Sequence, residues 1–375
     1  MATEKESNFY DKILNNMREY PNDIPIVDGE ISEAFREFIE LLFTPKEAEV
    51  VQYLTIKPQS LNRIARKIGK PKEEIKKILE EMTENGIIQD IGGFSYFLAM
   101  AHLLNMGFKN SKTFKRLGKK GAELYQQFFI KEKFYKRYES SDEGTPLTRI
   151  VPINSTIDHE SAISNAEEIH GIIDTCIGPI VITDCPCRNR TETLGIRECK
   201  DKFPISGSCF QVGLFGQYFL RRGEGKELSR GEAHELINEL ANKGLVFTVA
   251  NSKSPVHQVI CSCCACCCAL LRGLTRFEDI NENCVAKSNY ISKVNLDSCQ
   301  GCGLCAKRCP FEAIKITNEK AIVDPKKCYG CGVCAVTCPE EAIKLHRIEQ
   351  SHIYSDPVQL FQKIYQENRR KEDKT

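Results

Sequence analysis

The sequence lacks any run of the roughly 18 consecutive apolar residues that a transmembrane helix requires, so we expect no membrane span. Its first residues, MATEKESNFYDKIL, contain neither an apolar core nor a small-residue cleavage site, which argues against a secretory signal peptide. The net charge is +1 over 375 residues. The chain as a whole is therefore neither basic enough to attract nucleic acid nor acidic enough to be a solvating chain. We therefore expect a globular, cytoplasmic protein.

Signatures of catalysis and nucleotide binding are also missing. The sequence contains no Walker A loop, no dinucleotide fingerprint and no serine-nucleophile elbow. For this reason the sequence identifies no catalytic residue.

Cysteine is absent from the first 175 residues and abundant afterwards. The chain has 20 cysteines, and 15 of them lie between Cys261 and Cys338. A secreted disulfide scaffold would be short and would carry a signal peptide. In a reducing compartment, dense cysteines hold metal more often than they form disulfides. The distribution therefore favours metal ligation.

Two segments near the C-terminus repeat one another with an offset of 29 residues: CQGCGLCAKRCPFEAIKIT at 299–317 and CYGCGVCAVTCPEEAIKLH at 328–346. Each contains the run C-x-x-C-x-x-C-x-x-x-C-P, which is the ligand run of bacterial ferredoxins. The glycines between the first cysteines permit close approach of the backbone. A pair of zinc knuckles is the alternative, but zinc sites usually use separated cysteine pairs.

Residues 291–347 thus resemble the two-cluster bacterial ferredoxin domain, which has a pseudo-twofold fold of short hairpins and helices. The resemblance implies two low-potential [4Fe–4S] clusters that transfer electrons. In the ferredoxin pattern, the fourth cysteine of each run binds the other cluster. The first cluster would then be held by Cys299, Cys302, Cys305 and Cys338, and the second by Cys328, Cys331, Cys334 and Cys309.

Residues 145–290 are expected to form a small, cysteine-rich α/β domain. The apolar run IGPIVIT predicts a buried strand that ends just before Cys185 and Cys187. The stretch GSCFQVGLFGQYFLRRG at 207–223 predicts a helix. The candidate ligands of an additional cluster or a zinc ion are Cys185, Cys187, Cys199, Cys209, Cys261, Cys263, Cys264, Cys266, Cys267 and Cys268.

Three chemical interpretations fit the run CSCCACCC at 261–268. It can supply thiolates to one or more further iron–sulfur clusters, form a zinc site with Cys185 and Cys187, or act as a thiol–disulfide relay. A fourth interpretation assigns these cysteines no chemical role: they would pack in the core as small apolar side chains. Adjacent side chains point in different directions, so the six thiols cannot all bind one ion but can be divided between two sites. We favour clusters, with Cys185 and Cys187 as partners from the strand end.

Residues 44–100 resemble a winged helix-turn-helix. Thr44 and Pro45 begin a first helix, Gly69 ends a second, a third follows over 71–86, and Gly92-Gly93 marks a hairpin. Residues 44–90 contain nine basic and eight acidic residues, whereas a DNA-reading surface has little acid nearby. This balance favours protein docking over DNA binding.

Three further segments flank these regions. We expect an N-terminal helical segment over 1–43, a basic helical segment and linker over 101–144, and a C-terminal helical tail over 348–375. Within the basic segment, residues 109–139 contain ten Lys or Arg and three Glu. Such a segment can bind a phosphate backbone, steer an acidic redox partner, or simply form a solvated helix face.

The expected architecture is an α+β multidomain protein: a winged-helix-like module, an α/β cysteine-rich domain and a ferredoxin-like domain. The pattern C-x-C-R, followed by CSCCACCC and the ferredoxin repeat, resembles uncharacterised anaerobic 4Fe–4S dicluster proteins over 145–347. We predict an electron carrier or oxidoreductase subunit that passes single electrons from a low-potential donor to a redox partner in anaerobic metabolism. The alternatives are a redox-sensing DNA-binding regulator and a reductase with its substrate at a middle-domain cluster.

Overall fold

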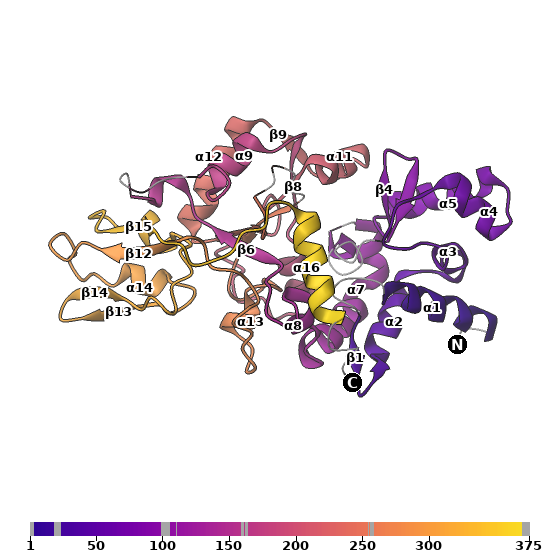
Figure 1. The fold of residues 1–375 in the computed structure, drawn as a ribbon, viewed down its shortest axis with the longest axis horizontal. Coiled ribbons are helices and arrows are strands. Elements are labelled where there is room, and N and C mark those ends of the chain that lie inside the picture. Colours follow the sequence, from indigo (N-terminus) through magenta and orange to yellow (C-terminus); the bar gives the residue numbers. More distant parts are fainter. Residues whose placement is uncertain are drawn as a thin grey trace. The chain divides into compact units, whose positions relative to one another are not determined.

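The computed structural model describes residues 4–18, 24–98, 106–109, 111–158, 161, 164–253, 255 and 259–369. These residues form two compact units (Figure 1). The N-terminal unit comprises the described residues up to Tyr138 together with Cys185–Arg197. The C-terminal unit comprises Glu139–Asp184 and the described residues from Glu198 onward. Within the described part of the chain, no helix is both long and apolar enough to cross a membrane.

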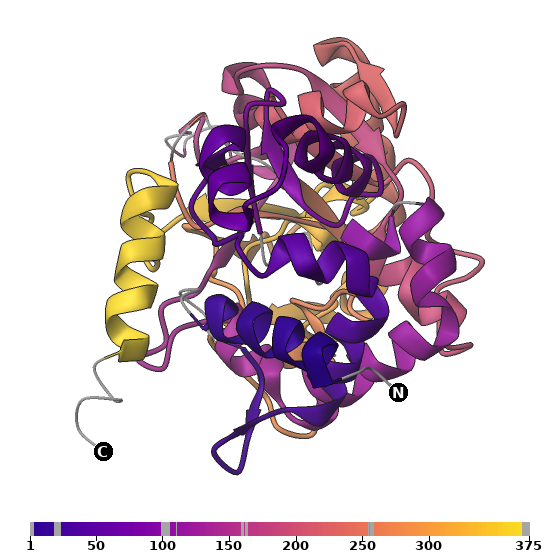
Figure 2. The same cartoon turned by 90° about the vertical axis from the view of Figure 1, so that its right-hand side faces the viewer.

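Helices make up most of the N-terminal unit, which is coloured indigo to purple in Figures 1 and 2. Aromatic rings fill its core: Phe38 packs edge-on against Phe128 with ring centroids 5.4 Å apart, and Tyr125 stacks on Phe129 at 4.7 Å. Outside the module described next, its elements are α1 (Glu4–Met17), β1 (Ile26–Val27), β2 (Glu30–Ile31), α2 (Glu33–Leu42), η1 (Met106–Phe108), α7 (Ser111–Tyr125), the π-helix η2 (Gln126–Lys131), α8 (Phe134–Glu139) and α10 (Pro186–Thr193).

Residues 44–98 form three helices and three short strands, in the order helix, strand, helix, helix, strand, strand. The Thr44 side chain accepts a hydrogen bond from the Glu47 amide in a capping box, so the first helix begins where the sequence predicts it. Gly69, with φ of 74°, ends the second helix in the left-handed conformation. The expected helices and hairpin are α3 (Pro45–Val51), α4 (Leu61–Ile68), α5 (Lys72–Glu84), β4 (Gln89–Ile91) and β5 (Ser95–Phe97), and β3 (Gln59–Ser60) joins the hairpin in a sheet of order β3-β5-β4.

A six-stranded sheet of order β6-β10-β11-β8-β7-β9 forms the centre of the C-terminal unit. Every neighbouring pair of its strands is antiparallel, so the expected α/β domain is wrong in this respect. Most of the helices in this part of the chain join strands that are not neighbours in the sheet, so the order of helices and strands along the sequence does not set the direction of neighbouring strands. The strands are β6 (Thr148–Val151), β7 (Ile180–Thr183), β8 (Cys209–Val212), β9 (Lys226–Leu228), β10 (Val246–Ala250) and β11 (Val259–Cys263).

The expected helix over 207–223 is also wrong in its first part. Cys209–Val212 forms β8, and helix α11 begins only at Gly213 and ends at Arg221. Strand β8 lies between β7 and β11 and is hydrogen-bonded to both. This pairing on two sides outweighs the helical preference that the local sequence suggests. The Ser208 hydroxyl, just before β8, donates to the carbonyls of Pro204 and Ile205.

Two buried cores lie on opposite faces of this sheet, because neighbouring residues of a strand point to opposite faces. Phe210, Phe247 and Ile260 belong to one core, together with helices α9 (Ile169–Thr175) and α12 (Arg230–Lys243). Val246 and Cys263 belong to the other, which reaches the ferredoxin-like repeat. The remaining elements of this part are η3 (Asn154–Thr156), α13 (Arg272–Thr275) and α16 (Pro357–Arg369), and α16 forms part of the expected C-terminal tail.

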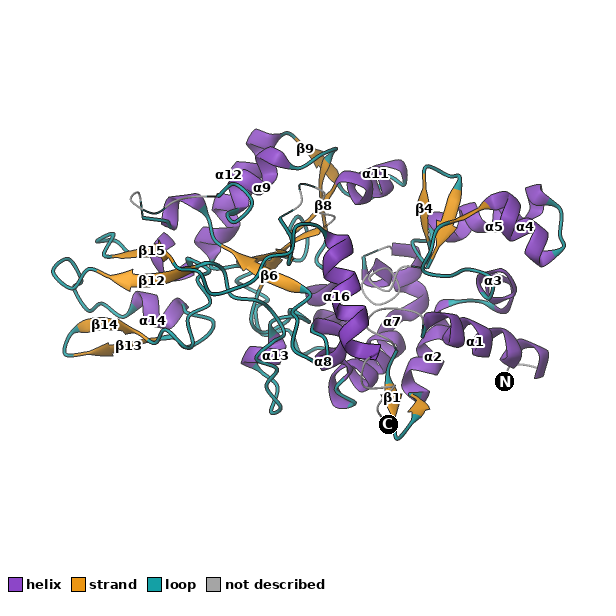
Figure 3. Ribbon diagram, in the orientation of Figure 1, coloured by secondary structure: helices purple, strands orange, loops and turns teal. Residues whose placement is uncertain are grey.

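The C-terminal repeat folds into two equivalent halves of strand, helix and strand (Figure 3). The halves exchange strands, since β12 pairs with β15 and β13 pairs with β14, all antiparallel. The first half is β12 (Tyr290–Val294), α14 (Leu304–Arg308) and β13 (Ile314–Thr317). The second is β14 (Lys320–Val323), α15 (Val333–Val336) and β15 (Ile343–Arg347).

Candidate metal centres

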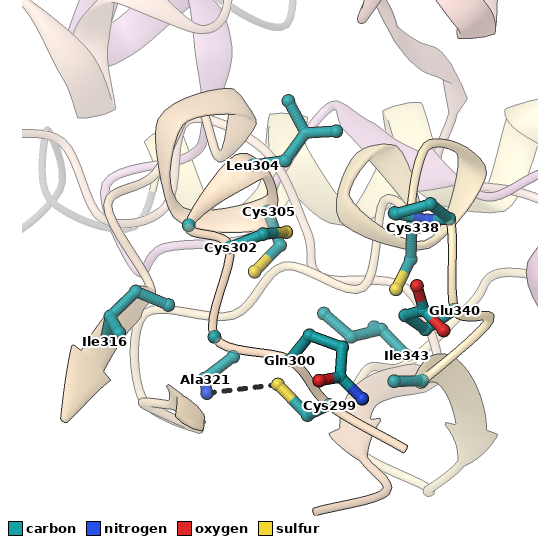
Figure 4. Close-up of a pocket in the computed structure, with 14 residues that line it drawn as sticks. Cys299, Gln300, Cys302, Leu304, Cys305, Ile316, Ala321, Cys338, Glu340 and Ile343 are labelled. Carbon is teal, nitrogen blue, oxygen red and sulfur yellow. Dashed lines mark hydrogen bonds between the residues drawn. The ribbon is translucent and has the colours of Figure 1, made fainter. Parts of the chain in front are cut away.

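Four cysteines of the repeat surround a hollow of about 360 Å³, which we call the first hollow. Figure 4 shows their sulfur atoms pointing into one common space. Three of them belong to the first copy of the repeat, and the fourth comes from the second copy. The four are Cys299, Cys302, Cys305 and Cys338.

Glycine is required in the loop that forms this hollow. Gly301 has φ of 63°, and a Cβ atom on it would lie 2.2 Å from the carbonyl oxygen of Glu319. Only a residue without a side chain lets the two backbone segments approach so closely. The hollow therefore depends on the repeat's Cys-x-Gly-Cys spacing.

Backbone hydrogen bonds favour the thiolate form on one side of the first hollow. The amide of Ala321 donates to Cys299 Sγ over 3.5 Å, a bond drawn as the dashed line in Figure 4. This bond, and a second one from Gly301, lower the pKa of Cys299 below its usual value. A cysteine with a lowered pKa is a good metal ligand, because metals bind the thiolate.

The second hollow, of about 290 Å³, repeats this arrangement with the copies exchanged. It is lined by Cys328, Cys331 and Cys334 from the second copy and by Cys309 from the first. Burial raises the pKa of Cys331 well above its usual value and that of Cys334 to about 12. The Ser292 hydroxyl lies 3.2 Å from Cys334 Sγ and stabilises its ionised form. Sequence reasoning missed Ser292, although it stands at an inward position of β12.

The two hollows differ in their access to solvent. Cys302 in the first hollow is exposed, whereas the equivalent Cys331 is partly covered and packs against a buried core of the C-terminal unit. Leu304 and Ile316, which also line the first hollow, are each 38 % exposed. The first hollow thus opens onto an apolar patch of the surface.

A separate set of thiols, the tight thiol group, lies beneath the six-stranded sheet. Cys199 Sγ is 3.6 Å from Cys267 Sγ and 3.9 Å from Cys264 Sγ, and Cys266 Sγ is 3.6 Å from Cys267 Sγ. All four sulfurs lie within 4.8 Å of one another. Hydrogen bonding with Cys199 and Cys264 raises the pKa of both Cys266 and Cys267, because the crowded thiols share protons.

The other cysteines of the run face the opposite side of the sheet. Cys261 on β11 stands directly opposite Cys209 on β8, so the two side chains share one face. Cys263 points to that same face, and its Sγ lies 3.1 Å from Cys268 Sγ. We call Cys209, Cys261, Cys263 and Cys268 the strand thiols.

The remaining two candidates belong to the other unit. Cys185 is the N-cap of α10, and Cys187 lies in the first turn of that helix, within the N-terminal unit. The predicted strand before them is β7, which ends at Thr183. The tight thiol group and the strand thiols come entirely from the C-terminal unit.

The helix α5 of the N-terminal unit presents more acid than base to solvent. Its side chains of Lys72 and Lys77 are exposed, but so are five glutamates: Glu73, Glu74, Glu80, Glu81 and Glu84. In the basic segment, Lys120 pairs with Glu37 at 2.8 Å and Arg116 pairs with Glu47 at 2.7 Å. Part of the positive charge of this segment is therefore neutralised within the unit.

Comparison with known proteins connects the repeat to iron–sulfur binding. A family described as the 4Fe-4S binding domain matches residues 292–315, and one described as the LdpA Fe-S cluster-binding domain matches residues 305–349. The pyruvate synthase subunit PorD of Methanothermobacter marburgensis is 44 % identical over 39 residues, which are 10 % of this chain and 44 % of that protein. No solved structure matches the chain. The C-terminal region is therefore an iron–sulfur-binding domain of the 4Fe–4S ferredoxin type.

Proposed function

We propose that this protein transfers single electrons between a low-potential donor and an oxidoreductase partner, in a reducing and anaerobic setting. The observation that carries the proposal is the pair of hollows, each lined by three cysteines of one repeat copy and one of the other. A bound [4Fe–4S] cluster supplies a one-electron couple without making or breaking covalent bonds in the protein.

The residues of the repeat are suited to hold such clusters. Cys299, Cys302, Cys305 and Cys338 would hold the first, and Cys309, Cys328, Cys331 and Cys334 the second. Gly301 lets the ligand loop close around its hollow, and backbone amides donate to Cys299. Hydrogen bonds to ligand sulfur and exclusion of water are the means by which a protein sets the reduction potential of a cluster. The donor set fits the ferredoxin interpretation, because each hollow is lined by four cysteine thiols.

We propose the exposed side of the first hollow as the place of contact with the redox partner. Cys302 is exposed there, and Leu304 and Ile316 add an apolar rim. The partner is inferred to be an oxidoreductase, since PorD, similar over 39 residues, is a subunit of pyruvate synthase. Cys302, on this exposed side, would help to hold the group that supplies the one-electron couple to the partner.

The strand thiols are proposed to hold a further iron–sulfur cluster within the C-terminal unit. Their core contains Tyr329 and Val333 from the second copy of the repeat, and Cys331 packs against it. A cluster in this position would extend the path of electrons from the second hollow toward the sheet. A reductase with substrate at this cluster is the alternative use of the same site.

The N-terminal module is proposed to dock a protein rather than to read DNA. Its order of helices and strands is that of a winged helix-turn-helix, which keeps the redox-sensing regulator as the second candidate. The five exposed glutamates of α5 weigh against that candidate, because they would face the phosphates of a bound duplex.

A reductive titration of the anaerobically prepared full chain tests the proposed function. We expect reversible one-electron steps and the electron paramagnetic resonance signal of reduced [4Fe–4S] clusters. Cys302→Ser should accept about one electron fewer than the wild type. The control Cys176→Ser replaces a buried cysteine outside every set described above and should leave the titration unchanged. A chain that binds iron and sulfide but takes up no electrons would refute the proposed transfer.

A further inference from the structure

The tight thiol group has the dimensions of a coordination shell around one ion. Zinc binds cysteine sulfur at about 2.3 Å in a tetrahedron, whose edges are then about 3.8 Å long. The measured sulfur–sulfur distances are 3.6 Å for Cys199 to Cys267, 3.9 Å for Cys199 to Cys264 and 3.6 Å for Cys266 to Cys267. They match the edges of that tetrahedron.

An iron–sulfur cube makes a different demand on its ligands. Its four thiolates bind four different iron atoms at separate corners, so the ligand sulfurs must stand apart around the cube. The two ferredoxin sets meet this demand, because their cysteines line hollows of about 360 and 290 Å³. Within the part of the chain that the structure describes, no other group of three or more cysteine, histidine or acidic ligand atoms gathers within 4.8 Å.

Three of the four cysteines in the tight thiol group lie in closed, apolar surroundings, and Cys266 is partly exposed. Cys199, Cys264 and Cys267 are 6 %, 4 % and 0 % exposed, and they pack in the core that contains Phe210 and Ile260. Zinc sites in which protein ligands occupy all four positions are structural, whereas catalytic sites keep one position open. Four sulfur donors around one point are the donor set of a structural zinc site.

We propose that Cys199, Cys264, Cys266 and Cys267 hold a single structural Zn²⁺ ion, and that this group therefore stands apart from the electron path. The four thiols lose four protons when the ion binds, and no electron is transferred. The interpretation differs from the favoured expectation that the run serves further iron–sulfur clusters with Cys185 and Cys187, because it assigns the two sides of the run to different chemistry. Cys264, Cys266 and Cys267 bind zinc, while the strand thiols face the other core.

The position of the group shows what the ion would do for the fold. Cys199 lies in the loop between α10 and β8, and the other three cysteines form the turn after β11. The Cys268 amide donates to the Cys264 carbonyl over 3.2 Å, which closes that turn. An ion bound by all four thiols would tie the loop to the turn and hold both against the sheet.

X-ray absorption at the zinc edge of the wild-type full chain, prepared without oxygen, tests the proposal directly. We expect about one zinc per chain with four sulfur neighbours at about 2.3 Å and no iron neighbour. In parallel, Cys199→Ser and Cys264→Ser should lower zinc to near zero and leave iron and sulfide unchanged. The control Cys176→Ser replaces a buried cysteine of the same core and should retain the zinc.

Four results would overturn the proposal. Loss of about four iron and four sulfide in Cys264→Ser, with zinc unchanged, would make the group a cluster site. Loss of one iron without sulfide would make it a mononuclear iron site, and unchanged metal in a folded variant would make it a packing feature. Should the variants fail to fold, the wild-type spectrum decides, since a chain without zinc refutes the proposal. Failure of the ferredoxin clusters would appear separately, as missing iron and sulfide beside intact zinc.

Discussion

The ferredoxin repeat and the turn after β11 arrange four cysteines in opposite ways. In the repeat, glycines with positive φ lead the backbone around a hollow, and the thiols of Cys299, Cys302, Cys305 and Cys338 point inward across it. In the tight thiol group, three cysteines of one turn and Cys199 from a distant loop close directly on one another. The same residue type thus leaves an open space between its sulfurs in one region and closes into a compact group in the other.

The difference teaches that the number of cysteines does not identify a metal site, whereas the space between their sulfurs does. Both regions contain buried thiols, and in both the pKa of several thiols is raised. What separates them is the backbone that carries the thiols. A loop whose glycines allow close backbone contact can bend around a large group, but a short turn anchored to β11 cannot.

The largest expected effect comes from removing one ligand of a hollow. Cys302→Ser and Cys331→Ser should each lower the iron content by about four atoms per chain, because the two ligand sets share no residue. Cys331→Ser should also lower the thermal stability of the C-terminal unit more, because Cys331 packs against its core and Cys302 is exposed. Iron, sulfide and zinc analysis and thermal unfolding check both statements. Equal iron in wild type and variants would contradict the ligand sets.

A change of one glycine tests whether the backbone makes the hollow. Gly301→Ala should lose most of the first cluster, because the new Cβ would lie 2.2 Å from the Glu319 carbonyl. Gly303→Ala is the matched control: it also has positive φ, but its Cβ would meet Ile316 at 3.8 Å, an ordinary contact. Gly303→Ala should thus retain more iron. The zinc content should stay constant in both variants. If zinc were lost together with iron, the hollows of the repeat and the tight thiol group would not be independent sites.

The pKa values predict a difference in assembly between the hollows. Metal binds the thiolate. In the first hollow the pKa of Cys299 is lowered and that of Cys305 is raised, whereas in the second hollow the pKa values of Cys309, Cys331 and Cys334 are all raised, the last to about 12. Lowering the pH from about 8.5 to about 7 should therefore slow assembly at the second hollow more than at the first. Assembly rates in Cys331→Ser and Cys302→Ser, each of which keeps one hollow intact, measure this. Equal slowing in both variants would show that the thiol pKa values do not control assembly.

Sequence reasoning predicted the repeat well, because its ligands are local. Three of the four cysteines of each set lie within seven residues, and the spacing itself encodes the loop. The grouping of Cys199 with Cys264, Cys266 and Cys267 was not predictable, because it depends on how a loop some 65 residues away packs beneath the sheet. The strand β8 was missed for a similar reason: its pairing with β7 and β11 is not visible in its own residues.

The smallest expected effect concerns DNA. If the N-terminal module docks a protein, the full chain should bind duplex DNA weakly, without sequence preference, and less at higher salt. Cys302→Ser or Cys331→Ser should change this DNA binding by less than about twofold, because the binding does not depend on a cluster. A regulator that senses through its clusters would instead lose or gain affinity for a specific DNA site in these variants. A site-specific footprint that disappears in these variants would favour the regulator.

One measurement tests the central claim most directly: iron, acid-labile sulfide and zinc per chain in a single anaerobic preparation of the wild-type protein. The account predicts at least eight iron, a matching amount of sulfide and about one zinc, because the two hollows hold cubes and the tight thiol group holds one ion. Several zinc per chain without sulfide would contradict it, because the repeat would then be a pair of zinc knuckles and no electron path would exist.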